Sequence, residues 1–228
     1  MNETIYAVLS LGFVLGVRHA MDPDHLVAVS TIVSRDKSIL HSSLAGTLWG
    51  LGHTASLLIC GGLVLALRLS VPPGIFAWAE KAVALMLICL GANVVWQCAK
   101  TYRLHVHTHR HNGGLPHAHL HVHDASAIEA HDHPHKFRVP TRSFFIGMIH
   151  GLAGTGALVV LVLASVPSIL AGLLYILLFG IGSIGGMLLL SSLISIPFVL
   201  SARRFRVFNN ALQLVAGLTS IALGVLWI

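Results

Sequence analysis

Long apolar runs occupy most of the chain and restrict the folds open to it. The hydrocarbon core of a bilayer is about 30 Å thick, and about 20 helical residues cross it. Apolar runs of about this length or more lie at roughly 4–32, 40–67, 76–98, 143–165, 168–199 and 209–228. Only 10% of the residues are charged, whereas soluble domains average about 25%. The sequence therefore predicts an all-α integral membrane protein with about six transmembrane helices, with lipid as its main solvent.

The basic residues predict the orientation of these spans. If six spans alternate, Arg68 and Lys81 fall on one side of the membrane. The other side receives Arg35, Lys37, Lys100, Arg103, Arg110, Lys136, Arg138, Arg142, Arg203, Arg204 and Arg206. The positive-inside rule makes this richer side cytoplasmic, so we expect a multi-pass protein of the cell inner (plasma) membrane with both termini outside. The basic residues form no groove-sized face, so we expect no nucleic-acid partner.

A weak internal repeat relates the two halves of the chain. When the halves are aligned, Gly16 falls on Gly147 and His19 on His150. With one residue of slippage, the segment 50–52 falls on 180–182, and both segments begin and end with glycine. The copies would cross the membrane in opposite directions, as in many secondary transporters whose sites lie between inverted repeats. Close helix packing alone also favours recurring glycines, so chance similarity stays an alternative.

This repeat predicts a division of the chain into three parts. Residues 1–99 form a first three-helix repeat, 100–142 a cytoplasmic loop, and 143–228 a second three-helix repeat. The first and fifth spans are longer than a bilayer requires, and each contains residues that bend helices, namely Pro23 and the glycines between 180 and 186. We expect both spans to be tilted or broken.

The first span contains a dense group of ionisable residues, Arg18-His19-Ala20-Met21-Asp22-Pro23-Asp24-His25. Each charge in the middle of a membrane helix costs about 2.5 to 3.5 kcal/mol on insertion scales, so the group needs compensation or a function. On one helix His19, Asp22 and His25 would share a face. We expect Pro23 to kink the helix and to release the His19 carbonyl toward the site. Arg18 would partly neutralise the two aspartates.

Imidazole nitrogen combined with carboxylate oxygen suits borderline divalent ions such as Ni, Co, Zn or Cu. The group therefore predicts a metal site formed by His19, Asp22, Asp24 and His25. The structural alternative is a network of ion pairs, for example Arg18 with Asp24, that only fixes helix packing. A proton relay is a second functional alternative, and it is compatible with metal binding because metal displaces protons from histidine.

Two further histidines lie within apolar spans and are flanked by glycines. His53 stands in the second span and His150 in the fourth, where the repeat pairs it with His19. Each could be a satisfied packing residue, but the cost of a polar group in the membrane favours a place in the metal site. Asn93, Ser183 and Gln213 are weaker candidates.

A third feature is an internal tract of alternating histidines in the loop between the third and fourth spans. It carries most of the 16 histidines: His105, His107, His109, His111, His117, His119, His121, His123, His131, His133 and His135. Its composition predicts a disordered segment. Imidazoles at this density chelate transition metals, so we expect metal binding here. The tract could take part in transport, or it could buffer, sense or collect cytoplasmic metal.

The motif in the first span resembles the hallmark of the nickel/cobalt transporter (NiCoT) family, which is His-x4-Asp-His preceded by Arg in a transmembrane helix. Gly52-His53-Thr54 is similar to the family's second signature, Gly-His-Ser/Thr in the following helix. The runs 26–35, 49–54 and 150–154 look closest to the compact urease-accessory (UreH-like) nickel permease branch.

The resemblance implies that His19, Asp24 and His25 are required for metal recognition, that His53 assists, and that Arg18, Pro23 and Thr54 support the site. Classical members have eight spans with the motif in the second, whereas this chain begins at the motif helix. Efflux members of the wider superfamily carry Glu-Pro-Gly-His where this chain has Asp22-Pro23-Asp24-His25, which favours uptake.

We therefore predict a secondary permease that takes Ni²⁺ into the cytoplasm, with Co²⁺ as the alternative ion. The resemblance implies cytoplasmic nickel chaperones or urease and hydrogenase maturation proteins as partners. No P-loop is present, so protons or the membrane potential would drive transport. No cofactor and no enzymatic reaction are expected. The alternatives are nickel or cobalt efflux, a membrane metal sensor that does not transport, and an intramembrane metalloenzyme.

Overall fold

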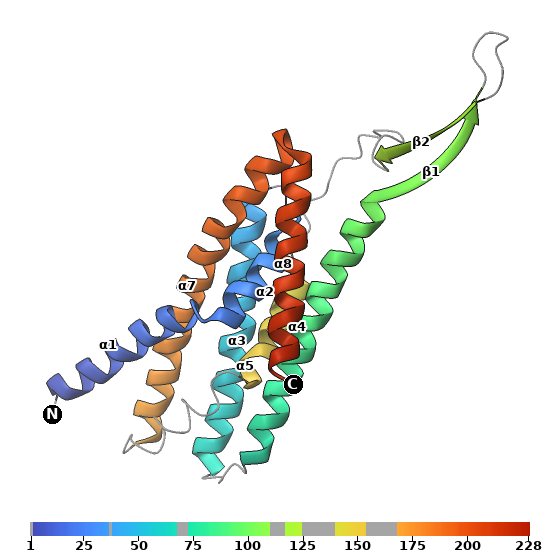
Figure 1. The fold of residues 1–228 in the computed structure, drawn as a ribbon. Coiled ribbons are helices and arrows are strands. Elements are labelled where there is room, and N and C mark those ends of the chain that lie inside the picture. Colours follow the sequence, from blue (N-terminus) through green and yellow to red (C-terminus); the bar gives the residue numbers. More distant parts are fainter. Residues whose placement is uncertain (1, 37, 68–72, 110–116, 125–139, 154–167) are drawn as a thin grey trace.

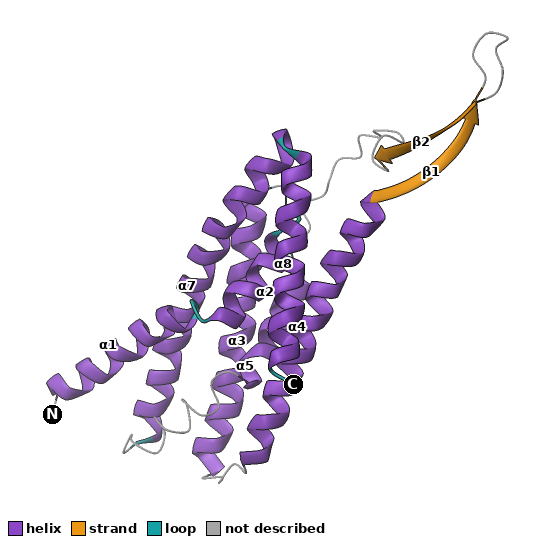
Figure 2. Cartoon of the chain, in the orientation of Figure 1, coloured by secondary structure: helices purple, strands orange, loops and turns teal. Residues whose placement is uncertain are grey.

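The computed structural model describes residues 2–36, 38–67, 73–109, 117–124, 140–153 and 168–228, which form a helical bundle with a two-stranded hairpin (Figures 1 and 2). The helices are α1 (Asn2–His19), α2 (Pro23–Val33), α3 (Ile39–Leu67), α4 (Pro73–Thr101), α5 (Thr141–Ala153), α7 (Ile169–Arg204) and α8 (Arg206–Leu226). The strands are β1 (Tyr102–His109) and β2 (His117–Asp124).

Four of the described helices, α3, α4, α7 and α8, are long and apolar enough to cross a membrane. Large apolar side chains such as Leu193 and Leu200 cover their outer surface, as expected where lipid is the solvent. The prediction of a helical membrane protein is therefore confirmed at this level. The fourth predicted span begins with α5 and continues into residues outside the described part of the chain, so the count of six stays a prediction.

The two spans that were expected to bend behave differently. The first is broken, because α1 ends at His19 and α2 begins at Pro23. The helix α1 slants away from the bundle and leaves its N-terminal end far from the other helices (Figure 1). In contrast, α7 is one continuous helix of 36 residues. Its glycines serve close packing instead, since a Cβ at Gly182 would overlap the backbone of Phe13 in α1.

Two helix crossings use the same pattern of glycines. Where α1 meets α7, Gly16 faces the carbonyl of Phe179 and Gly182 faces that of Phe13. Where α5 meets α3, Gly147 faces the carbonyl of Trp49 and Gly52 faces that of Phe144. At all four glycines an added Cβ would overlap the facing carbonyl oxygen. The four helices therefore approach each other so closely that only glycine fits at these positions.

The histidine-rich segment differs from the expected disorder in the part that the structure describes. β1 and β2 pair antiparallel, with His105 opposite His121 and His107 opposite His119. Histidine alternates here with Val, Leu, Thr or Ala, and this period of two suits a strand. The hairpin continues from α4 and lies outside the bundle (Figure 1). Four histidines of the tract, His111, His131, His133 and His135, lie outside the described residues.

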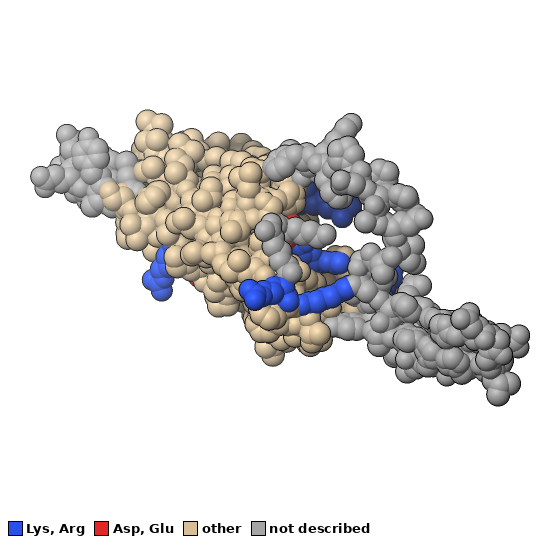
Figure 3. All heavy atoms as spheres, turned by 90° about the horizontal axis from the view of Figure 1, so that it is seen from above, with Lys and Arg blue, Asp and Glu red and all other residues tan. Residues whose placement is uncertain are grey.

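Basic side chains gather at the end of the bundle from which the hairpin extends. Seen from that end, Lys and Arg stand out against a largely uncharged surface, with only a trace of Asp and Glu (Figure 3). The element ends that meet there carry Arg35 after α2, Lys100 near the end of α4, Arg204 at the end of α7 and Arg206 at the start of α8. The helices that end here are joined by the loops in which the sequence has most of its positive charge.

Candidate metal centre

The histidine and aspartate motif lies on both sides of the break between α1 and α2. His19 is the last residue of α1, and Pro23 is the first of α2, where a missing amide hydrogen costs nothing. The amide of Asp22 donates to the His19 carbonyl at 3.0 Å. The expectation that Pro23 would release this carbonyl toward the site is therefore wrong, because the turn supplies another donor. The effect of the break is to orient two short helices separately, each with one histidine of the motif.

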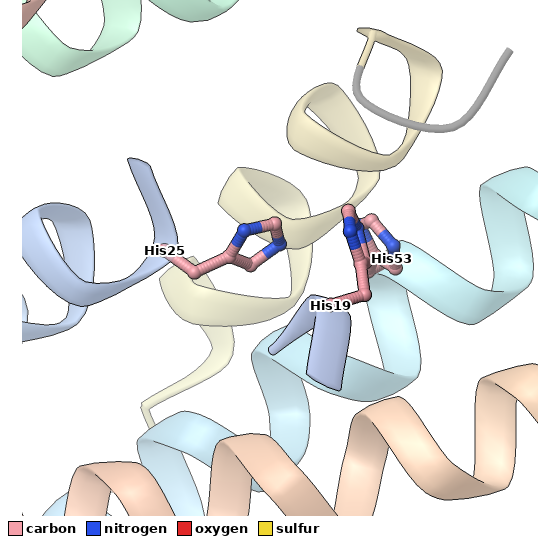
Figure 4. Close-up of side chains that lie close together, drawn as sticks. All are labelled: His19, His25 and His53. Atoms are coloured by element: carbon pink, nitrogen blue, oxygen red, sulfur yellow. The ribbon is translucent and has the colours of Figure 1, made fainter. Parts of the chain in front are cut away.

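Three histidines from three helices meet inside the bundle: His19 of α1, His25 of α2 and His53 of α3 (Figure 4). Their ring centroids are 4.6 Å apart for His19 and His25, 5.2 Å for His19 and His53, and 5.5 Å for His25 and His53. Each offers a ring nitrogen within 4.8 Å of those of the other two. His25 and His53 are fully buried and His19 nearly so. The arrangement is a three-nitrogen ligand set of the kind that borderline divalent ions prefer.

Several nitrogens of this set lack hydrogen-bond partners. Within the described part of the chain, Nε2 of His19, Nε2 of His25 and both ring nitrogens of His53 are buried and unpaired. Leaving a buried polar group unpaired costs about 1–3 kcal/mol. A packing function alone would not explain four such atoms in one place. A bound cation would satisfy one nitrogen of each ring, which is three of the four atoms.

Asp24 joins this group to a fourth histidine. Its Oδ1 accepts a hydrogen bond from the His25 amide at 2.9 Å and lies 3.0 Å from Nδ1 of His25. Its Oδ2 lies 2.9 Å from Nε2 of His150 in α5. Asp24, His25 and His150 are all buried, and each offers a ligand atom within 4.8 Å of the others. The structure thus contains two overlapping three-residue groups that could hold a metal, and His25 belongs to both.

Asp22 has a more exposed position than Asp24. Its Oδ2 lies 2.8 Å from Nδ1 of His19, and its side chain is 48% exposed. Each aspartate therefore holds Nδ1 of one histidine, which leaves the Nε2 atoms of His19 and His25 for the centre of the cluster. Carboxylates that orient metal-binding imidazoles in this way are common around metal sites. The expected face with His19, Asp22 and His25 on one helix is wrong, because these residues belong to two helices and a turn.

Two aromatic rings that were not predicted from the sequence enclose the cluster. Trp49 stacks on His25 with centroids 5.5 Å apart, and its ring is 5.4 Å from that of His150. Phe179 lies 5.4 Å from His19. Trp49 is one helical turn before His53, so its spacing in the sequence was the available signal. These rings keep bulk water from the histidines and lower the local dielectric constant.

The other predicted residues lie outside this cluster or at its edge. Arg18 is exposed and forms no ion pair with any described residue, so it does not neutralise the aspartates. Thr54 donates to the Gly180 carbonyl at 3.3 Å and thereby joins α3 to α7. Asn93 bonds to Gln97, and Gln213 bonds to Asn209. Ser183 is fully buried, and its hydroxyl has no partner among the described residues.

Comparison with known proteins identifies the family. Residues 5–225 match the family described as NicO, high-affinity nickel-transport protein. The urease accessory protein UreH of Bacillus sp. (strain TB-90) is 41% identical over 97% of this chain and 90% of its own length. The chloroplast proteins FOR GROWTH AND FERTILITY 1 and 2 of Arabidopsis thaliana are 27% and 30% identical over 76% of this chain, which spans 45% and 43% of their lengths. No solved structure gives a significant match.

These matches confirm the resemblance to nickel transporters that the motifs indicate. The family model covers nearly the whole chain, and the UreH relative aligns almost end to end. The predictions of a nickel permease and of a protein that is not an enzyme are confirmed with it. The chain belongs to the NicO family of high-affinity nickel-transport proteins.

Proposed function

We propose that this nickel permease carries Ni²⁺ into the cytoplasm through the buried histidine cluster. The observation that carries the proposal is the meeting of His19, His25 and His53 from three helices, with unpaired nitrogens aimed at one another inside the bundle. A membrane protein that buries four imidazoles, each with at least one unpaired ring nitrogen, has a use for them. In a nickel-transport family, that use is to replace the water ligands of the ion during its passage.

In this proposal His19, His25 and His53 bind the ion directly, and Asp22 and Asp24 hold the first two rings in place. His150 completes the site through Asp24. Arg18, Pro23 and Thr54 support the site from outside, with Pro23 at the break and Thr54 at the contact between α3 and α7. Nickel is the substrate and not a resident cofactor. Co²⁺ accepts the same nitrogen and oxygen ligands and is proposed as a second substrate.

We further propose that residues 1–99 and 143–228 are inverted repeats that rock against each other around this site. The matching glycine contacts support this, because α1 meets α7 through the same pattern by which α5 meets α3. In such a pair of repeats His150 of α5 corresponds to His19 of α1. A site at the contact between the repeats can be exposed to either side of the membrane in turn.

The end that carries the basic residues and the hairpin is proposed to be cytoplasmic, with both chain termini outside. The positive-inside rule favours this orientation in the inner (plasma) membrane. A dication that moves inward across 100 mV gains about 4.6 kcal/mol, so the membrane potential alone favours uptake.

The histidine tract between residues 100 and 142 is proposed to bind metal on the cytoplasmic side. The backbone pairing of β1 and β2 supports this, because it sets His105 opposite His121 and His107 opposite His119. Soluble nickel chaperones or urease and hydrogenase maturation proteins are proposed to receive the ion. The urease accessory protein UreH among the relatives supports such a connection.

Direction is tested by measuring radioactive nickel in cells that express the full-length protein. We expect them to accumulate more nickel than vector controls, and to lose this excess when the membrane potential is collapsed. Cells that hold less nickel than the controls would identify an efflux protein and contradict uptake. The His41→Gln variant is a matched control, because His41 bonds to Asp36 outside the cluster.

A further inference from the structure

We infer that the ion passes through two overlapping stations that share His25: first His19, His25 and His53, then Asp24, His25 and His150. This inference rests on the proposed function and adds an internal step to it. The structure contains both three-residue groups in one buried volume, and His25 is the residue that they have in common.

The position of His25 between two neighbours supports a transfer. Its ring centroid lies 4.6 Å from that of His19 and 4.1 Å from that of His150. Its Nε2 is unpaired, whereas its Nδ1 lies 3.0 Å from Asp24. One ring can therefore present Nε2 to the first station and Nδ1 to the second, so that His25 supplies a ligand at both ends of the transfer.

The ligands of both stations are buried, but the stations differ in charge and in the exposure of the residues next to them. The first has three imidazoles and no carboxylate, and its His19 contacts Asp22, whose side chain is 48% exposed. The second includes the Asp24 carboxylate, which bonds to the fully buried His150. A hydrated dication therefore reaches the first station more easily, and the carboxylate then attracts it inward. Because of this difference, the ion binds at the station with His53 before it binds at the station with His150.

Two stations of three ligands each also suit transport better than a single buried site that contains the ligands of both. Each leaves room for a water molecule on the ion, so neither holds it as tightly as a closed four-ligand site. The contacts of Asp24 with His25 and His150 must be rearranged when the ion arrives, which lowers its affinity further. Passage requires binding that is strong enough for capture and weak enough for release.

The test separates binding from flux in the full-length protein. The variant His150→Gln keeps an amide donor for Asp24 but removes the imidazole ligand, and His53→Gln removes a ligand of the first station only. We expect His53→Gln to weaken Ni²⁺ binding by about tenfold or more, the loss that removal of a metal ligand or its support causes. We expect His150→Gln to leave binding of the first ion unchanged and to reduce flux into proteoliposomes by about tenfold or more. His41→Gln should change neither quantity.

Two outcomes would overturn the inference. Flux of His150→Gln equal to that of the unmodified protein would reduce His150 to a residue that positions Asp24. Equal losses of binding in both variants would indicate one undivided site. If the unmodified protein itself moves no nickel, the proposed function is wrong. If the unmodified protein moves nickel and His150→Gln moves it at the same rate, only the inference of two stations is wrong.

A second variant reports on the ion's position without relying on activity. In His150→Cys a thiolate replaces the imidazole, and thiolates are good ligands for borderline divalent ions. Co²⁺ added to the purified variant is expected to produce a thiolate-to-cobalt charge-transfer band that is absent from the unmodified protein. A folded variant that binds Co²⁺ without this band would contradict the second station.

Discussion

Oδ2 of Asp24 lies 2.9 Å from Nε2 of His150, a residue 126 positions later in the chain. Oδ1 of the same carboxylate holds His25. One side chain of α2 therefore sets the position of two imidazoles, one of which belongs to the second half of the protein. The metal cluster depends on this carboxylate as much as on the histidines themselves.

Replacement of this carboxylate gives the first prediction. Asp24→Asn should weaken nickel binding and flux by about 10–100-fold. The reason is that an amide has one acceptor oxygen, so it can accept a hydrogen bond from only one of the two imidazole rings. Asp22→Asn is the matched variant, and it should cost less because Asp22 is half exposed and holds only His19. Equilibrium binding of Ni²⁺ to the purified proteins measures both. A larger loss in Asp22→Asn than in Asp24→Asn would contradict this arrangement.

The contact between α1 and α7 gives a prediction about stability. Gly182→Ala should destabilise the protein by about 1–3 kcal/mol, because its new methyl group would overlap the Phe13 carbonyl. Gly185→Ala, on the same helix, meets no atom within 4 Å and should be neutral or stabilising. Thermal unfolding in detergent compares the two. Equal melting temperatures would mean that the helices do not approach as closely as described.

The break before α2 predicts an effect of Pro23. In Pro23→Ala a new amide can donate to the His19 carbonyl and compete with that of Asp22, which would draw the two helices toward one continuous helix. We expect lower nickel flux with an unchanged amount of protein in the membrane. Pro197→Ala, a proline inside α7, serves as the control and should retain flux. Full activity of Pro23→Ala would show that the break is not needed.

The histidine tract yields a prediction about stoichiometry. Deletion of residues 105–135 should reduce the number of Ni²⁺ ions bound per chain and leave inward flux through the bundle intact, because the buried cluster contains none of these residues. Equilibrium dialysis and proteoliposome flux measure the two effects. Loss of flux in a folded deletion variant would assign the tract a necessary part in transport.

The residues of the cluster could be predicted from the sequence, but their arrangement could be predicted less well. A high local density of ionisable residues in an apolar span is visible without a structure, and His19, Asp24 and His25 were found on that ground. His150 was predicted from the repeat and from the cost of a polar group in the membrane, and the structure places it against Asp24. Both aspartates were predicted as ligands, and in the structure each also lies against Nδ1 of a histidine and can orient its ring. This second function depends on side-chain rotation, which spacing along the chain does not encode.

Other features required the fold itself. Trp49 and Phe179 contact the histidines from α3 and α7. The spacing of Trp49 from His53 was a signal for the first, but nothing in an apolar span distinguishes Phe179 from an aromatic residue that faces lipid. The glycines of α7 predict a bend or break, but in the structure they allow close contact with α1 and α3. A glycine in a membrane helix suits both purposes, so the choice between them depends on which helix lies opposite.

The central claim is that nickel enters the cell through the buried histidine cluster. Its most direct test compares uptake of radioactive nickel by cells that express the unmodified protein or His25→Gln, at equal amounts in the membrane, because His25 belongs to both ligand groups. We expect accumulation with the unmodified protein and only the background of vector controls with the variant. Undiminished uptake by His25→Gln would contradict it.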